Sequence, residues 1–159
     1  MKSISLISNV ILFSLLALPQ QVFAQQPPEA QRMDWLVGDW KYEDLDGGAK
    51  CKWLGDFTIH CESSWTNNAG ETTEAVFLTR YDPEAKIYTA HRFYSGGYTD
   101  SGLGWVDGDT WSFVYEGPAG DRYRFTGVIS EDTWTYEWHS SVKGGSWERT
   151  AGGSMKKVQ

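Results

Sequence analysis

The chain has 159 residues, which fits a single domain, and it carries nine Trp, eight Tyr and seven Phe. A chain this rich in aromatic side chains is too apolar to be disordered, and its lack of Leu, Lys and Ala runs excludes a coiled coil or helical bundle. The formal net charge of −7 excludes a protein whose main role is to bind the phosphate backbone of nucleic acids.

Residues 1–24 are predicted to be a signal peptide. A positive residue near the start precedes an apolar stretch from Ile4 to Leu18, and Val22 and Ala24 occupy positions −3 and −1 of a cleavage site. The apolar stretch is shorter than the about 20 residues that a membrane span needs, which disfavours an uncleaved anchor. We therefore expect export to the bacterial periplasm or secretion, with no membrane span left after cleavage.

The rest of the chain divides into a leader and one domain. Residues 25–32 are expected to be a flexible leader and residues 33–157 the folded domain, with one or two helical turns within residues 29–36. After these turns, clusters of Gly, Pro, Asp and Asn predict nine turns, at residues 46–48, 55–56, 67–70, 82–83, 96–97, 107–108, 117–120, 131–132 and 144–145. Nine turns separate ten candidate strands.

The candidate strands predict an all-β fold. Residues 111–115 and 134–138 alternate between aromatic and polar side chains, which is the period of a strand with one buried face. No long helical stretch interrupts the series, so the parallel crossovers of α/β folds are excluded. We expect an antiparallel up-and-down meander barrel of about ten strands with a short N-terminal helix, because closure removes exposed sheet edges. A Greek-key sandwich is the alternative.

Two cysteines, Cys51 and Cys61, lie in the part of the chain predicted to be exported. An even number of cysteines in an oxidising compartment favours a disulfide. A hairpin with a three-residue loop at 55–57 would place the two cysteines directly opposite each other, within reach of a disulfide. A two-residue loop would offset them by one residue.

The segment Leu36-Val37-Gly38-Asp39-Trp40 resembles the opening of the calycin barrels, the lipocalins and their relatives. In that family the Trp fills the barrel floor and an Arg of the last strand packs across it, so the resemblance implies these structural roles for Gly38, Trp40 and Arg149. Residues 33–156 also resemble a bacterial family of exported domains of unknown function. The matching segments are Leu36–Trp40, Cys51–Cys61, Tyr81–Tyr88 and Gly108–Trp111. This resemblance implies a barrel and export. It carries over no activity, because the family has no established one.

Calycin barrels mostly carry small apolar or amphipathic molecules, and a barrel of eight to ten strands has room for one ligand. The aromatic faces of three successive strands are the candidate ligand-binding residues: Trp111, Phe113, Tyr115, Tyr123, Phe125, Trp134, Tyr136 and Trp138. Such rings would stack on a flat molecule. In the alternative interpretation, the same rings simply fill the barrel.

His91 and Arg92 are further candidates, because both faces of their strand carry large side chains and one of the two must point inward. An inward Arg92 would need an anionic partner, so an outward Arg92 is favoured. An inward His91 would allow a less favoured hypothesis, a haem-binding barrel. His60 and His139 share faces with polar residues and are expected outside.

The sequence lacks the motifs of common enzymes and of metal sites. We therefore expect no catalysis, no metal and no cofactor. The favoured function is a monomer that binds a small hydrophobic or aromatic molecule without transforming it. The alternative is an envelope interaction or structural module with a filled barrel, acting through its outer surface.

Overall fold

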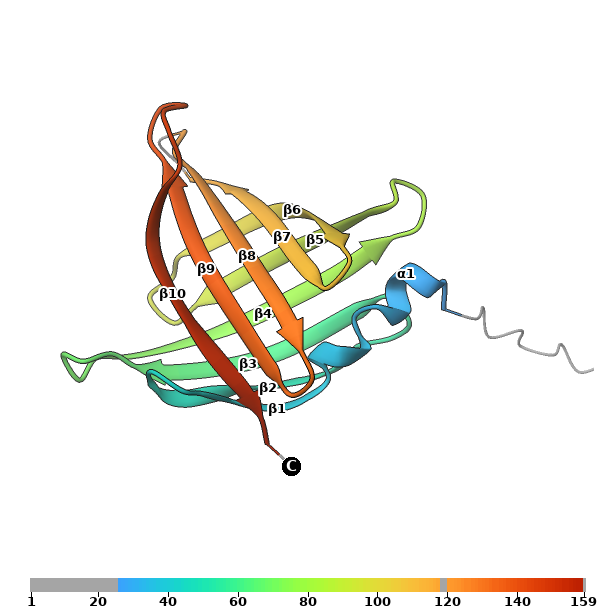
Figure 1. The fold of residues 1–159 in the computed structure, drawn as a ribbon, viewed down its shortest axis with the longest axis horizontal. Helices are drawn as coiled ribbons and strands as arrows, with labels where there is room; N and C mark the ends of the chain where they lie inside the picture. Colours follow the sequence, from blue (N-terminus) through green and yellow to red (C-terminus); the bar gives the residue numbers. More distant parts are fainter. Residues whose placement is uncertain (1–25, 118–119, 159) are drawn as a thin grey trace, which may run out of the picture.

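A computed structural model describes residues 26–117 and 120–158, which form a closed barrel of ten antiparallel strands (Figure 1). Two short helical segments come first, α1 (Pro28–Gln31) and the 3-10 helix η1 (Asp34–Leu36). The strands follow in chain order: β1 (Gly38–Tyr42), β2 (Asp46–Trp53), β3 (Thr58–Thr66), β4 (Thr72–Asp82), β5 (Ile87–Tyr94), β6 (Thr99–Asp107), β7 (Thr110–Glu116), β8 (Arg122–Ser130), β9 (Thr133–Ser141) and β10 (Glu148–Lys157).

The topology is the predicted up-and-down meander. Each strand pairs with its neighbours in the chain, and β1 closes the barrel by pairing with β10 through the register Trp40 opposite Lys157. A fully closed sheet has no unpaired edge strand, which removes the usual site of edge-to-edge aggregation. The prediction of an all-β barrel with a short N-terminal helix is confirmed.

The first predicted turn is wrong by about three residues. Gly47 and Gly48 lie inside β2, and the chain reverses before them, between Tyr42 and Asp46. A Cβ at Gly47 would overlap with the carbonyl oxygen of Ser64, and one at Gly48 with that of Trp40. These glycines therefore allow β1, β2 and β3 to approach closely. The prediction failed because it treated every glycine pair as a turn.

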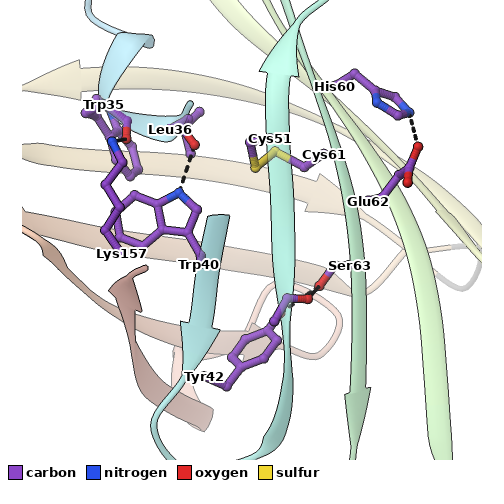
Figure 2. Close-up of a disulfide and its surroundings, with 11 residues drawn as sticks. Trp35, Leu36, Trp40, Tyr42, Cys51, His60, Cys61, Glu62, Ser63 and Lys157 are labelled. Carbon is purple, nitrogen blue, oxygen red and sulfur yellow. Dashed lines mark hydrogen bonds and ion pairs between the residues drawn. A yellow bond between two sulfur atoms is a disulfide. The ribbon is translucent and has the colours of Figure 1, made fainter. Parts of the chain in front are cut away.

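The Cys51–Cys61 disulfide joins β2 and β3 (Figure 2). The two cysteines are direct cross-strand partners with their Cα atoms 4.0 Å apart. The Leu54 amide donates a hydrogen bond of 2.7 Å to the Thr58 carbonyl, which closes the three-residue loop. The predicted disulfide and hairpin register are both confirmed.

Trp40 lies buried at one end of the barrel, and its indole N–H donates to the Leu36 carbonyl at 2.8 Å. The expectation that Arg149 packs across this ring is wrong. Arg149 lies at the start of β10 and donates to Glu137 at 2.9 Å, on an exposed surface. Because β10 runs antiparallel to β1, its last residues reach Trp40, and Lys157 places its Nζ 5.4 Å from the Trp40 ring (Figure 2).

The N-terminal segment covers this end of the barrel (Figure 1). Ala30 and Met33 are fully buried, and the Tyr88 hydroxyl donates to the Glu29 carbonyl at 2.6 Å. Residues 28–31 form the short helix α1, of which Ala30 is the buried residue. The predicted signal peptide, residues 1–24, lies outside the described residues. Among the residues that are described, no helix is long and apolar enough to cross a membrane.

Candidate functional site

The barrel encloses a cavity of about 510 Å³. All eight predicted aromatic residues line it, as the alternation in the sequence indicated. They come from three neighbouring strands and are Trp111, Phe113 and Tyr115 of β7, Tyr123 and Phe125 of β8, and Trp134, Tyr136 and Trp138 of β9. The rings therefore form one wall of a cavity of the size that holds a small organic ligand.

Small residues at several inward positions of the other strands leave space inside the barrel. Gly102 and Gly104 of β6 lie directly opposite Tyr115 and Phe113 of β7. A Cβ at Gly102 would lie 2.6 Å from the Tyr115 ring, so the aromatic rings lie flat over these glycines. Ala49, Ala90 and Ala151 also line the cavity. Ala90 of β5, Gly102 and Gly104 thus form a small-residue wall next to the aromatic wall.

A cluster of indole rings closes one end of the cavity. Trp35 of η1 lies 6.0 Å from Trp40, 5.4 Å from Trp111 and 5.1 Å from Trp134, measured between ring centroids. The contacts are edge-to-face, an arrangement that aromatic rings favour. Trp35 was not predicted as a site residue, because its place in a short helix before the first strand carries no pattern.

Aromatic residues also surround the opposite end. Tyr94 lies 6.4 Å from Trp65 and 5.6 Å from Tyr98, and all three line the cavity. Tyr98 is 43% exposed, so the cavity meets solvent here. The sequence analysis missed these residues, although Tyr94 and Tyr98 flank the Gly96-Gly97 turn symmetrically and so had to lie on one face.

Arg92 points into the barrel, which corrects the prediction that it faces outward. Its Nε donates to Asp100 Oδ1 at 2.6 Å, and its Nη2 donates to Asp100 Oδ2. The side chains of Arg92 and Asp100 are only 11% and 4% exposed. The two residues are direct cross-strand partners in β5 and β6, so the strand pairing itself supplies the anion that a buried guanidinium needs.

The guanidinium of Arg92 also contacts two rings of the aromatic wall. Its central carbon lies 3.8 Å from the Tyr115 ring centroid and 4.4 Å from that of Trp138. Burial alone would lower the pKa of Arg92, but the hydrogen bond to Asp100 raises it above its ordinary value. Arg92 therefore remains a cation inside the cavity.

Three tyrosine hydroxyls in the cavity, those of Tyr42, Tyr115 and Tyr136, remain protonated at neutral pH. Burial raises the pKa of Tyr136 to about 12, and it raises the pKa of Tyr115 as well. Burial raises the pKa of Tyr42, and this effect outweighs that of the 3.0 Å hydrogen bond to Ser63, which lowers the pKa. These hydroxyls therefore act as neutral polar groups in the cavity.

The three histidines lie outside the barrel. His91 is exposed, with its Nδ1 2.7 Å from the Ser101 hydroxyl, so the prediction that it lines the site is wrong. It alternates with the inward residues Ala90 and Arg92, which fixes its direction. His60 and His139 lie on the outer face, 4.0 Å from Glu62 and 3.8 Å from Glu137. The haem hypothesis thus loses its candidate ligand.

Within residues 26–117 and 120–158, no group of three or more His, Cys, Asp and Glu side chains comes together as a metal site would require. A second, shallower hollow of about 790 Å³ overlies β1–β5 and carries exposed charged side chains, including Asp39, Lys41 and Lys50. The interior cavity is the better candidate site, since it lies inside the barrel and is mostly apolar.

Comparison with known proteins gives a likeness in fold alone. No protein-family model matches the chain, and no curated protein matches it. The crystal structure of Rv2717c from M. tuberculosis is similar, with a TM-score of 0.61 and 14% sequence identity. The match covers 84% of this chain and 99% of that one. At this identity, the likeness supports the barrel architecture and carries no function.

Proposed function

We propose that this protein is an exported, calycin-like barrel that holds a small hydrophobic or aromatic molecule in its interior without transforming it. The observation that carries the proposal is the 510 Å³ cavity with eight aromatic residues of β7–β9 on one side. Rings that line an interior space offer both apolar contact and stacking to a flat ligand, and the small residues next to them leave room for it.

The charged groups of the cavity favour binding over catalysis. Asp100 is the carboxylate of the cavity lining, and both of its oxygens accept hydrogen bonds from Arg92. A general base needs a free lone pair within reach of the substrate proton. Asp100 is held by its partner instead, and the tyrosine hydroxyls, with their raised pKa values, are poor bases at neutral pH.

Export and a monomeric state belong to the same proposal. The Cys51–Cys61 disulfide is compatible with an oxidising compartment, and residues 1–24 have the pattern of a signal peptide. The closed barrel offers no free strand edge to a second copy.

Native mass spectrometry of the protein purified from its own host tests the binding function. We expect a mass excess over the polypeptide, which disappears when the protein is denatured. The Ala90→Phe variant fills the cavity from its small-residue wall and should lose the excess mass. The His91→Phe variant carries the same new ring on the outer face and should retain it. Circular dichroism checks that both variants fold.

The bare polypeptide mass in the wild type, under conditions that preserve the fold, would contradict the binding function. Equal loss of bound mass in both folded variants would place the ligand outside the cavity.

A second candidate function is supported by apolar residues on the outer face of β5 and β6. Phe93, Leu103 and Trp105 are 44%, 56% and 50% exposed. Exposed apolar groups on neighbouring strands are a feature of interaction surfaces, so an envelope interaction module is the alternative. If the outer surface carries the function, replacement of Leu103 and Trp105 by Ser abolishes the interaction. If the interior binds a ligand as proposed, the same replacement leaves the mass excess intact.

A further inference from the structure

We propose that the cavity selects neutral planar molecules over anionic ones, because the cation in its wall is already neutralised from within the barrel. This inference rests on the proposed binding function and names the class of ligand that the cavity would take. It is carried by the geometry of the Arg92–Asp100 pair and its place among the rings of β7 and β9.

Among the described residues, the cavity lining contains one cation and one anion, Arg92 and Asp100, and the two are bonded to each other. The pairing is bidentate, with one guanidinium edge meeting both carboxylate oxygens. The opposite charges of the pair therefore nearly cancel in their effect on a third charged group in the cavity. A lone inward Arg would be a receptor for a carboxylate or sulfonate, but this one is already occupied.

An anion that entered the cavity would lose its hydration without gaining an unopposed positive charge. Attraction to Arg92 would be opposed by repulsion from the Asp100 carboxylate bonded to it. Since transfer of a charge from water into an apolar site is strongly unfavourable unless it is paired, anions are disfavoured. A neutral aromatic molecule has no such cost and gains the full contact with the rings.

The pair also leaves one feature for a neutral ligand to use. Nε and Nη2 of Arg92 donate to Asp100, whereas Nη1 has no hydrogen-bond acceptor among the described residues. Its guanidinium lies over the Tyr115 and Trp138 rings. A carbonyl or other neutral acceptor on a molecule bound against the remaining rings of the aromatic wall could therefore accept from Nη1, which would orient the ligand.

The test compares two fluorescent probes that share one aromatic skeleton. N-phenylnaphthylamine is neutral, and anilinonaphthalene sulfonate adds one negative charge to the same skeleton. Their dissociation constants are measured for the wild type and for Asp100→Asn, which frees the charge of Arg92. The control is Asp39→Asn, which removes the same charge from a side chain that is 56% exposed on the outer face.

We expect the wild type to bind the neutral probe more tightly. Asp100→Asn should strengthen binding of the sulfonate by about tenfold, the change that about 1.4 kcal/mol produces, with little effect on the neutral probe. Asp39→Asn should leave the ratio of the two constants unchanged. Tighter binding of the sulfonate by the wild type, or the same ratio in both variants, would overturn the inference while binding itself stands.

The double variant Arg92→Met with Asp100→Leu keeps the test decisive if Asp100→Asn does not fold. With both charges removed, the ratio of the two constants should stay within about threefold of the wild type, because the pair contributed little net charge. A loss of sulfonate binding in this variant would make Arg92 an anion receptor and overturn the inference. If neither probe binds the folded wild type, the proposed binding function fails with it.

Discussion

Arg92 shows what the sequence could and could not reveal about a single side chain. Inward and outward positions of β5 both carry large residues, so alternation left its direction open, and the outward direction was favoured by the cost of a buried charge. The missing information was its partner. Arg92 and Asp100 are equidistant from Gly96, but an opposite-charge pair across a hairpin is equally compatible with a solvent-exposed face. The direction follows from the register of β5 in the closed barrel, where Arg92 shares the inward face with Tyr88 and Ala90.

The buried pair has a measurable effect on stability. Arg92→Met leaves the Asp100 carboxylate, which is 4% exposed, without its partner, and should lower the free energy of unfolding by about 3 kcal/mol. The double variant with Asp100→Leu should restore it to within about 1 kcal/mol of the wild type, because two apolar side chains replace two desolvated charges. Urea denaturation of the two single variants and the double variant measures the coupling. Additive effects of the two substitutions would show that the pair does not act as a unit.

At the scale of strands, the turn residues and alternation predicted most of the barrel. The aromatic faces of β7, β8 and β9 could be predicted from the sequence, because aromatic residues at every second position of a strand all lie on its buried face. Gly47 and Gly48 misled because glycine serves close strand packing as well as turns. The prediction for Arg149 was wrong because the resemblance to calycins implies only that an Arg of the last strand packs on Trp40. The antiparallel register of β10 places Lys157, and not Arg149, opposite Trp40.

The glycines of β6 provide a test of the small-residue wall. A Cβ at Gly104 would overlap with the Phe113 ring, whereas nothing lies within 4 Å of one at Gly96 in the β5–β6 turn. Gly104→Ala should therefore lower the free energy of unfolding by about 1–3 kcal/mol, as overpacking of a core does. Gly96→Ala is the matched control and should stay within about 0.5 kcal/mol of the wild type. Thermal or urea denaturation measures both, and equal effects would contradict the close packing of β6 on β7.

The disulfide fixes the β2–β3 hairpin at the cavity wall. Cys51 and Cys61 are separated by 10 residues in sequence, and closure of so short a loop restricts the unfolded chain modestly. We expect reduction, or replacement of both cysteines by Ala, to lower the free energy of unfolding by about 2–3 kcal/mol. Denaturant unfolding with and without reductant provides the measurement, and an unchanged midpoint would show that the bond contributes no stability.

At the scale of the whole molecule, the barrel has an aromatic wall on β7–β9 and, next to it, the small-residue wall of Ala90, Gly102 and Gly104 on β5 and β6. Composition alone predicts many buried rings, but it does not distinguish a filled barrel from one with a cavity. The distinction depends on which residues lie next to the rings, and these include Gly102, Gly104 and, one strand further, Ala90. The cavity is therefore a property of strand register, which appears only when the barrel is assembled.

The central claim, that the interior takes up a neutral aromatic molecule, is tested most directly by NMR of the tryptophan indole N–H groups. N-phenylnaphthylamine is titrated into the labelled wild-type protein, and each indole resonance is assigned by substitution. We predict that the Trp111 and Trp138 resonances shift, because both rings line the cavity, while that of Trp105 stays in place on the outer face. Shifts confined to Trp105, or no shift in the cavity rings at saturating probe, would contradict the account.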